Sequence, residues 1–276
     1  MIRERTIETA GRRIAWIEAG AGWPVILLHA FPFNADMWRL QLANVPGGWR
    51  FIAPDLRGFG QTPLHRHDAN PDEAAVALTL DDYATDVGCL MDGLELDTAV
   101  IGGLSIGGYV VFALFRQAPS RFSGMLLADT RPQADTADAR RGRTGLRQIL
   151  AQRGPSGVAD EMLPKLLSER TLQERPTIVE HARQIVEANQ PRAIDAAIGA
   201  MMTRPDSTGD LPRIACATLV MVGADDTVTP PSDAEAMQRE IPRSTLTVIP
   251  DAGHLSNLEQ PDAFSKGLRD FLFAHL

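Results

Sequence analysis

The sequence predicts an α/β fold with a mostly parallel central sheet, helices on both faces and a helical insertion. Short apolar runs rich in branched side chains recur along the chain, and several are followed by segments whose apolar residues have helical spacing. This alternation is typical of parallel strands joined by helical crossovers. Residues 130–211 are richer in charge and in helix-forming residues than their surroundings, which indicates an insertion into the sheet domain.

Length and composition limit the number of domains and the class of partner. The 276 residues, 44% of them hydrophobic, suffice for one substantial core and a small accessory subdomain. We expect a core domain from residues 1–130 and 211–276 and a helical lid from residues 131–210. The formal net charge of -8 disfavours nonspecific binding to nucleic acid or to anionic membranes.

The beginning of the chain is charged and lacks the apolar run of a secretory signal, and no later segment approaches the length of a transmembrane helix. We therefore expect a cytoplasmic protein that does not act at a membrane. Cys89 and Cys216 are the only cysteines, so neither a disulfide framework nor a zinc cluster is predicted.

The first half of the chain supplies the N-terminal part of the sheet. Its predicted elements are, in order, a hairpin at residues 6–18, a strand at 25–28, a short helix at 36–44, a strand at 51–53 and a helix that begins at a capping box of Thr79 and Asp82. The polar loop at residues 61–78 contains His65, His67 and Asp68, but no further histidine or cysteine completes a ligand set. We expect neither a metal ion nor another cofactor.

The stretch at residues 98–115 contains the clearest candidate for chemistry. Residues 98–101 predict a buried parallel strand, and residues 106–115 have apolar side chains at helical spacing. Ser105 therefore lies on the turn between a strand and a helix. Gly103 and Gly107 flank it, which fits a turn so tight that side chains at those two positions would collide. Such a turn raises the serine hydroxyl above the sheet edge and aims the next backbone N–H at the same point.

The second half of the chain completes the sheet. The predicted elements are a strand at 124–128, insertion helices that include 160–168 and 176–189, a strand at 218–223, a helix at 232–240, a strand at 246–249 and a C-terminal helix. Ser232 and Glu235 predict a capping box at the start of the helix at 232–240. Asp129, Asp226 and His254 each come shortly after a strand.

Four motifs together resemble those of the α/β-hydrolases. They are the G-x-S-x-G pattern at 103–107, His29-Ala30 after the strand at 25–28, the turn sequence PDLRGFG at 54–60, and DAGHLSNLEQP at 251–261. Within that superfamily the chain is similar to the branch of serine esterases, enol-lactonases and cofactor-free haloperoxidases. One departure from the family pattern is Ala30, where the family has glycine.

The resemblance implies a role for each motif. Ser105 would be the nucleophile, His254 the general base and Asp226 the acid, in the chain order that this fold uses. The oxyanion hole would consist of the backbone N–H groups of Phe31 and Ile106. Some members of the fold place the acid after an earlier strand, so Asp129 remains an alternative to Asp226. His29 is expected to bond within its own loop rather than to react.

We therefore expect a carboxylesterase that hydrolyses small, largely apolar esters through an acyl-enzyme. A serine at position 105 argues against the dehalogenase and epoxide-hydrolase branches, whose nucleophile is a carboxylate. Three alternatives stay open: a lactonase of the enol-lactone or acyl-homoserine-lactone type, a perhydrolase or haloperoxidase, and a non-catalytic ligand-binding protein. Leu104, Val228 and Leu255 adjoin the predicted site in sequence and are candidates for the substrate wall. Neither the oligomeric state nor the acyl preference follows from the sequence.

Overall fold

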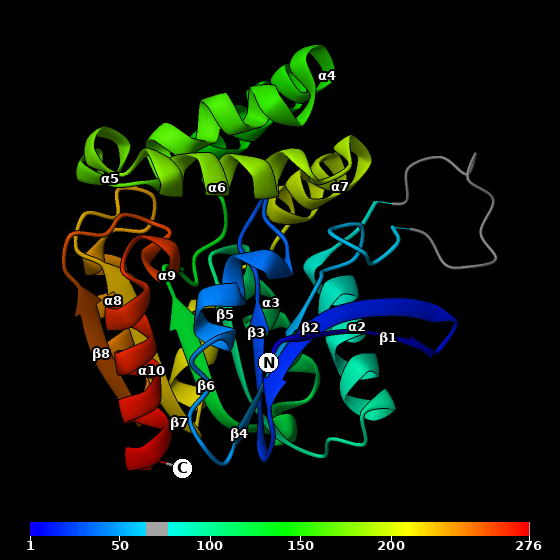
Figure 1. The fold of residues 1–276 in the computed structure, drawn as a ribbon, viewed down its shortest axis with the longest axis vertical. Helices are drawn as coiled ribbons and strands as arrows, with labels where there is room; N and C mark the ends of the chain where they lie inside the picture. Colours follow the sequence, from blue (N-terminus) through cyan, green and yellow to red (C-terminus); the bar gives the residue numbers. More distant parts are fainter. Residues whose placement is uncertain (65–76, 276) are drawn as a thin grey trace.

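The fold is a single twisted sheet with helices packed on both faces (Figure 1). The computed structural model describes residues 1–64 and 77–275, and within them eight strands are paired in the order β1-β2-β4-β3-β5-β6-β7-β8. The strands are β1 (Arg3–Thr9), β2 (Arg12–Gly20), β3 (Trp23–Leu28), β4 (Trp49–Pro54), β5 (Ala99–Leu104), β6 (Phe122–Ala128), β7 (Ala217–Gly223) and β8 (Ser244–Ile249). Among the strand pairs of the described residues, only β1–β2 and β2–β4 are antiparallel, so the predicted α/β fold with a mostly parallel sheet is confirmed.

The centre of the sheet is formed by β3 and β5. Alternate residues of β3 face opposite sides, so that Ile26 belongs to one apolar core and Val25 to the other. Both side chains have an exposed fraction of 0%, which explains why this strand is apolar throughout. In the parallel register, Leu28 pairs with Gly103, and the chain therefore leaves β3 and β5 side by side at the same edge of the sheet.

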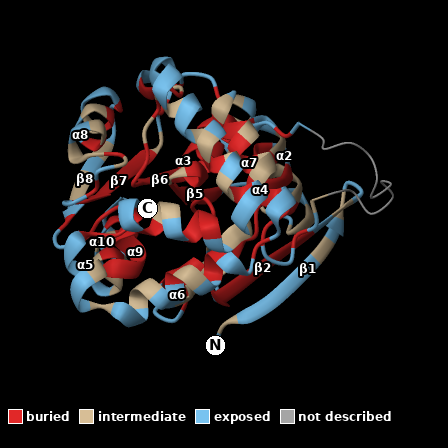
Figure 2. Cartoon of the chain, turned by 90° about the horizontal axis from the view of Figure 1, so that it is seen from above, coloured by how far each residue is buried: buried red, intermediate tan, exposed pale blue. Residues whose placement is uncertain are grey.

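Helices bury the two faces of the sheet. One core includes side chains of α2, α3 and α8, and the other includes side chains of α1 and α10. Seen from above, the strands are buried between helices whose outer sides are exposed (Figure 2). The helices outside the insertion are η1 (Ala35–Trp38), α1 (Arg39–Leu42), α2 (Leu80–Gly93), α3 (Ile106–Gln117), η2 (Pro119–Arg121), η3 (Thr208–Arg213), α8 (Pro231–Glu240), α9 (Ser256–Glu259) and α10 (Pro261–His275), where η denotes a 3-10 helix.

Two predicted helix starts had different outcomes. At α2 the capping box is present, because the Asp82 N–H donates to Thr79 Oγ1 and the Thr79 N–H donates to Asp82 Oδ2. At α8 the predicted box of Ser232 and Glu235 was wrong. That helix begins one residue earlier at Pro231, whose fixed φ suits the first helical position and which has no N–H to satisfy.

The insertion between β6 and β7 is helical and lies over the end of the sheet from which the strand β5 leads into α3 (Figure 1). It consists of α4 (Ala137–Leu166), α5 (Glu169–Glu174), α6 (Pro176–Glu187) and α7 (Pro191–Met202). The helix predicted at 176–189 corresponds to α6. The element α4 consists of two helical segments separated by a kink at Gly154, where φ is 65° and ψ is −163°. The start predicted at residue 160 was too late, because the helical segment after the kink already includes Pro155. The first part of α4 is largely exposed, so apolar spacing gave no signal for it.

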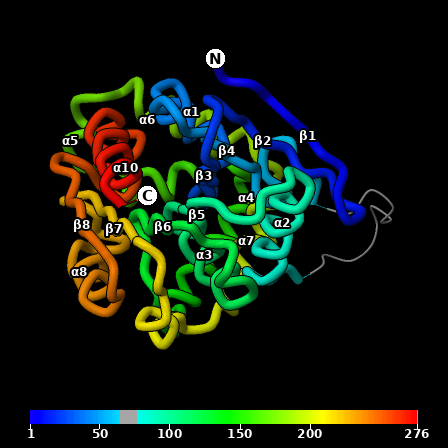
Figure 3. The backbone as a smooth tube through the Cα atoms, turned by 90° about the horizontal axis from the view of Figure 1, so that it is seen from below, coloured from blue at the N-terminus to red at the C-terminus, as the bar shows by residue number. Residues whose placement is uncertain are grey.

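The sheet is open at two margins, β1 on one side and β8 on the other (Figure 3). None of the helices in the described residues is long and apolar enough to cross a membrane. The loop histidines His65 and His67 and the carboxylate of Asp68 lie outside the described residues.

Candidate active site

Ser105 occupies the turn between β5 and α3, in the position that the sequence predicted. Its backbone has φ of 58° and ψ of −115°, a combination that non-glycine residues rarely adopt. A Cβ atom at Gly103 would lie 2.1 Å from the main-chain carbon of Gly107, and one at Gly107 would lie 2.4 Å from the carbonyl oxygen of Leu28. Only glycine fits at these two positions, so the turn can be as tight as it is.

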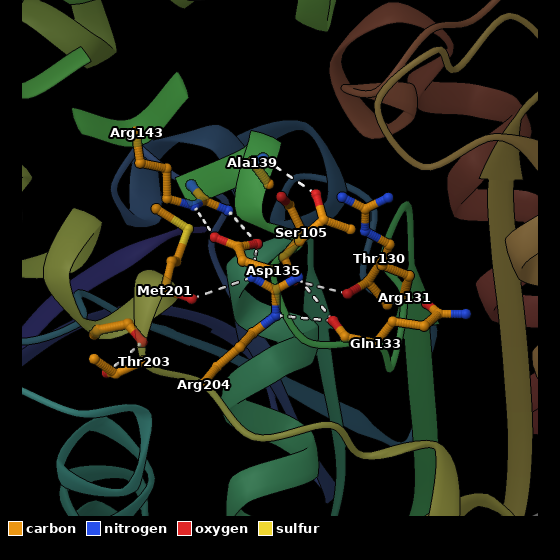
Figure 4. Close-up of polar contacts among 12 residues, drawn as sticks. Ser105, Thr130, Arg131, Gln133, Asp135, Ala139, Arg143, Met201, Thr203 and Arg204 are labelled. Atoms are coloured by element: carbon orange, nitrogen blue, oxygen red, sulfur yellow. Dashed lines mark hydrogen bonds and ion pairs between the residues drawn. The ribbon is translucent and has the colours of Figure 1, made fainter. Parts of the chain in front are cut away.

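Hydrogen bonds hold the main chain of Ser105 and leave its hydroxyl free. The Ser105 N–H donates to the Ala128 carbonyl at 3.0 Å. Thr130 Oγ1 donates to the Ser105 carbonyl at 2.8 Å, and both of these residues are drawn in Figure 4. Ser105 is half-buried, and its Oγ has no hydrogen-bond partner among the residues that the structure describes. The backbone is therefore fixed while the hydroxyl can approach another group.

Two backbone N–H groups near Ser105 lack acceptors in the part of the chain that the structure describes. Phe31 follows β3, and Ile106 is the first residue of α3, whose N–H has no intrahelical partner. Within residues 1–64 and 77–275, no acceptor is found for either N–H, although Phe31 and Ile106 are 3% and 1% exposed. Buried N–H groups without a partner are rare, and these two flank the edge where β3 and β5 end. They are suited to bind a negatively charged oxygen.

His254 and Asp226 form a buried pair. His254 Nδ1 lies 2.8 Å from Asp226 Oδ2, and their side chains are 1% and 0% exposed. Asp226 Oδ1 accepts the N–H groups of Val228 and Thr229 at 2.8 and 3.0 Å, and Thr229 Oγ1 donates to Oδ2 at 2.7 Å. Because the carboxylate occupies Nδ1, the Nε2 atom of the imidazole remains available for a proton acceptor role.

Burial works to raise the pKa of Asp226, but the His254 charge and the hydrogen bonds to the carboxylate outweigh it, and the net pKa is lowered. The group is therefore an ionised carboxylate at neutral pH. An ionised partner favours the imidazole tautomer that carries its proton on Nδ1.

Comparison with known proteins identifies the family of the chain. Residues 25–266 match the alpha/beta hydrolase family. The chain belongs to that family. A solved structure of a thermophilic esterase from Thermogutta terrifontis, in its malate-bound form, is 37% identical in sequence with a TM-score of 0.90, over 99% of this chain and 100% of that one.

Other relatives of this alpha/beta hydrolase have different activities. 3-Oxoadipate enol-lactonase 2 from Acinetobacter baylyi is 28% identical over 87% of this chain and 85% of that protein. A putative non-heme chloroperoxidase from Synechocystis is 28% identical over 94% of both. The family and these neighbours support a hydrolytic enzyme.

Asp129, the alternative acid, is equally buried in this hydrolase but bonds differently. It directly follows β6, and its Oδ1 accepts the Gly223 N–H at 2.8 Å while Ser256 Oγ donates to Oδ2 at 2.5 Å. Among the described residues it makes no hydrogen bond to His254. Burial, followed by the charge of Asp226, raises the pKa of Asp129 well above its usual range. The two aspartates therefore lie close together, and only Asp226 is bonded to the imidazole.

A third buried carboxylate, that of Glu259, holds the histidine loop to the insertion. Glu259 is 1% exposed, and its Oε1 accepts the Gly253 N–H at 2.8 Å. Its Oε2 accepts both the N–H and the hydroxyl of Ser168, at 2.9 and 2.7 Å, and Ser168 is the N-cap of α5. The Glu259 carboxylate therefore binds both Gly253, the residue before His254, and the insertion.

The base of the insertion is closed by ionic contacts (Figure 4). The Asp135 carboxylate is paired with the guanidinium groups of Arg143 and Arg204, and the Arg204 guanidinium lies 4.1 Å from the centre of the Tyr109 ring. Burial opposes ionisation of Asp135, but the two arginines outweigh it and lower its pKa. Ser207 then donates its N–H to the Pro132 carbonyl at 2.8 Å, which joins the segment that leaves the insertion to the segment that enters it.

Sequence reasoning missed three residues at this site: Thr229, Ser256 and Glu259. A signal existed for Thr229, because an aspartate followed by a threonine three positions later is typical of a local turn in which the carboxylate accepts backbone N–H groups. Ser256 and Glu259 lie within the motif at 251–261, but that motif does not indicate their bonds to Asp129 and Ser168, which lie 127 and 91 residues away.

The three residues predicted to line the substrate wall are placed as follows. Leu104 and Leu255 are 0% exposed and belong to one apolar core, while Val228 is partly buried against that core. Their contact with substrate stays a prediction. Among the described residues, no group of three or more histidine, cysteine or carboxylate side chains could hold a metal ion.

Proposed function

We propose that this alpha/beta hydrolase is a carboxylic ester hydrolase in which Ser105 is the nucleophile, His254 the base and Asp226 the acid. The observation that carries the proposal is the buried Asp226–His254 hydrogen bond of 2.8 Å, in the same fold as a serine on a strained turn. A serine hydroxyl is a weak nucleophile at neutral pH, so it requires a base that is itself oriented by a third group. Among the described residues no bond reaches Ser105 Oγ, which is consistent with this role because such contacts often tighten only when substrate binds.

In the proposed reaction, His254 Nε2 removes the proton from Ser105 Oγ as the oxygen attacks the acyl carbon. The carbonyl π electrons move to oxygen, and this oxyanion accepts the N–H groups of Phe31 and Ile106, donors worth about 3 kcal/mol each in barrier height. The imidazolium is stabilised by Asp226 and returns its proton to the leaving alcohol. Water then attacks the acyl-enzyme by the same steps, which releases the acid and restores Ser105.

We further propose that residues 131–210 act as a lid over this site and restrict it to small, largely apolar esters. The insertion helices lie over the sheet end that carries Ser105 (Figure 1). Several of their apolar side chains are buried, among them Leu163, Leu166, Ile185, Ile198 and Met201. At the base of the insertion, Arg143 and Arg204 are paired with Asp135, and Arg131 lies 3.9 Å from Asp233, so that each of these cations already faces a carboxylate.

A lactonase is the second candidate, and the relative named an enol-lactonase favours it. The same serine, base and N–H donors would open a cyclic ester, so the distinction lies in the shape of the pocket. A perhydrolase is the third, on the basis of the relative named a putative chloroperoxidase. Hydrogen peroxide would then replace water in the attack on the acyl-enzyme, and the product would be a peracid.

The test is hydrolysis of matched p-nitrophenyl esters and lactones, from acetyl upwards, by the wild-type enzyme and by Ser105→Ala. We expect turnover by the wild type that the alanine variant lacks, and stoichiometric labelling of Ser105 by a p-nitrophenyl phosphonate. Preference for cyclic substrates would assign a lactonase, and peracid formation in the presence of peroxide a perhydrolase. A wild-type enzyme that is neither labelled nor active on any member would contradict a serine mechanism.

A further inference from the structure

His29, the residue directly after β3, has a hydrogen-bonding pattern that fixes its tautomer. It is 0% exposed, and its Nε2 lies 3.0 Å from the backbone nitrogen of Leu56. A backbone N–H can only donate, so Nε2 must be the unprotonated nitrogen. The proton is therefore on Nδ1, which lies 2.9 Å from the carbonyl oxygen of Ala30 and donates to it. Burial lowers the pKa of His29 to about 4, which keeps the ring neutral at physiological pH.

The carbonyl that His29 holds belongs to the same peptide unit as the N–H of Phe31. In a trans peptide the C=O and N–H bonds point in opposite directions from one plane, so fixing the oxygen also fixes the direction of the N–H. The peptide bond between Ala30 and Phe31 is trans. Among the described residues, the cis peptide bond is the next one along the chain, between Phe31 and Pro32. The Ala30 oxygen accepts a second bond, from the Phe33 N–H at 2.9 Å, and the peptide plane is thereby held on its oxygen side by two donors.

The opposite side of this peptide plane is unpaired. Within the described part of the chain the Phe31 N–H has no acceptor, although the residue is 3% exposed. A site that stabilises a developing negative charge requires a donor that is already aligned and not otherwise bonded. Such a donor needs no reorientation during the reaction. Ala30 is not among the described non-glycine residues with positive φ, so the alanine does not strain this arrangement.

We propose that His29 is a positioning residue for the oxyanion hole: its Nδ1–H fixes the Ala30 carbonyl and thereby aims the Phe31 N–H at the oxyanion. The inference rests on the proposed function, since it assigns a role within that same site. The two ring nitrogens have separate tasks. Nε2 joins the loop after β3 to the loop after β4 through Leu56, and Nδ1 sets the peptide plane.

Two substitutions separate these tasks. His29→Asn keeps an N–H donor near the place of Nδ1 and loses the acceptor for Leu56, whereas His29→Gln places its amide near Nε2 and loses the donor to Ala30. A structural role alone would make both variants less stable and equally impaired. A positioning role predicts a larger loss of kcat for His29→Gln, by about 10- to 100-fold, with little change in KM and partial retention of kcat in His29→Asn.

The decisive readout compares an ester with its thionoester, in which sulfur replaces the carbonyl oxygen and accepts hydrogen bonds poorly. A working oxyanion hole favours the ester, so we expect the ester-to-thionoester ratio of kcat/KM to fall in His29→Gln and to stay close to the wild-type value in His29→Asn. An unchanged ratio in both variants would overturn the inference while leaving the serine mechanism intact. A wild type without Ser105-dependent turnover would instead overturn the proposed function, and the inference with it.

A measurement on the wild-type protein keeps the proposal testable if the variants do not fold. Nitrogen-15 NMR of the histidine rings should show His29 neutral and protonated on Nδ1 at pH 7. Addition of an alkyl boronic acid, which forms a tetrahedral anion on the serine, should shift the Phe31 amide proton downfield. Protonation on Nε2, or a Phe31 amide that does not respond to a boronate bound at Ser105, would contradict the proposal.

Discussion

Asp129 and Asp226 each follow a strand of the same sheet, each is at most 3% exposed, and each is bonded to the loop that carries His254. Their surroundings nevertheless move their pKa values in opposite directions. Burial raises the pKa of both groups. At Asp226 the imidazole and three further donors outweigh burial and the pKa is lowered. At Asp129 burial and the negative charge of Asp226 outweigh the Ser256 hydroxyl and the Gly223 N–H, and the pKa is raised. Position along the chain therefore does not decide which carboxylate serves the histidine. The number and charge of its hydrogen-bond donors do.

The largest expected effect comes from exchanging each aspartate for asparagine. Asp226→Asn presents an amide to His254 Nδ1 and favours the wrong tautomer, and a loss of about 10⁴-fold in kcat is expected. Asp129→Asn leaves the bond between Asp226 and His254 in place, so kcat should fall by less than about tenfold. The kcat of each variant is measured on one p-nitrophenyl ester and is expressed per active site, counted by covalent labelling of Ser105. The opposite ranking would transfer the role of acid to Asp129.

A smaller effect is expected from Thr229→Val, which keeps the shape of the side chain and removes the hydroxyl that donates to Asp226 Oδ2 at 2.7 Å. A hydrogen bond to a charged group contributes about 1.5–3 kcal/mol, so kcat should fall by about tenfold or somewhat more. The exposed neighbour Thr227 provides the matched control, Thr227→Val, which should retain the wild-type rate. Equal rates in the two variants would show that Thr229 does not support the acid.

The smallest effect, on stability, should differ in sign between the two aspartates. The pKa of Asp129 is raised, so its contribution to stability is fully present below the ordinary value of 3.8 and is lost as pH rises through the folded-state pKa. The pKa of Asp226 is lowered, so its contribution is present above 3.8 and is lost as pH falls through the folded-state pKa. As pH rises from 3 to 8, the Tm of Asp129→Asn minus that of the wild type should therefore increase. The Tm of Asp226→Asn minus that of the wild type should decrease. Parallel curves from calorimetry would contradict the assigned pKa directions.

Much of the site was predictable because its chemistry lies in local motifs. The turn at Ser105 needs glycines two residues away on either side, and those glycines stand in the sequence. The contacts that support the site join distant segments, such as Ser256 to Asp129 and Glu259 to Ser168, and no local pattern encodes them. The capping box predicted at Ser232 failed for a different reason. A local signal was present there, but the adjacent Pro231 provided a better start for the same helix.

The shared carboxylate of Glu259 means that the insertion is not an exchangeable module. Three donors satisfy this buried group, two from Ser168 in the insertion and one from Gly253 beside His254. Replacing residues 131–210 by the insertion of another hydrolase would leave this buried carboxyl group short of two donors, at a cost of about 1–3 kcal/mol in stability for each unsatisfied polar group. Grafts intended to change substrate range must therefore carry the start of α5 with its serine, or replace Glu259 at the same time.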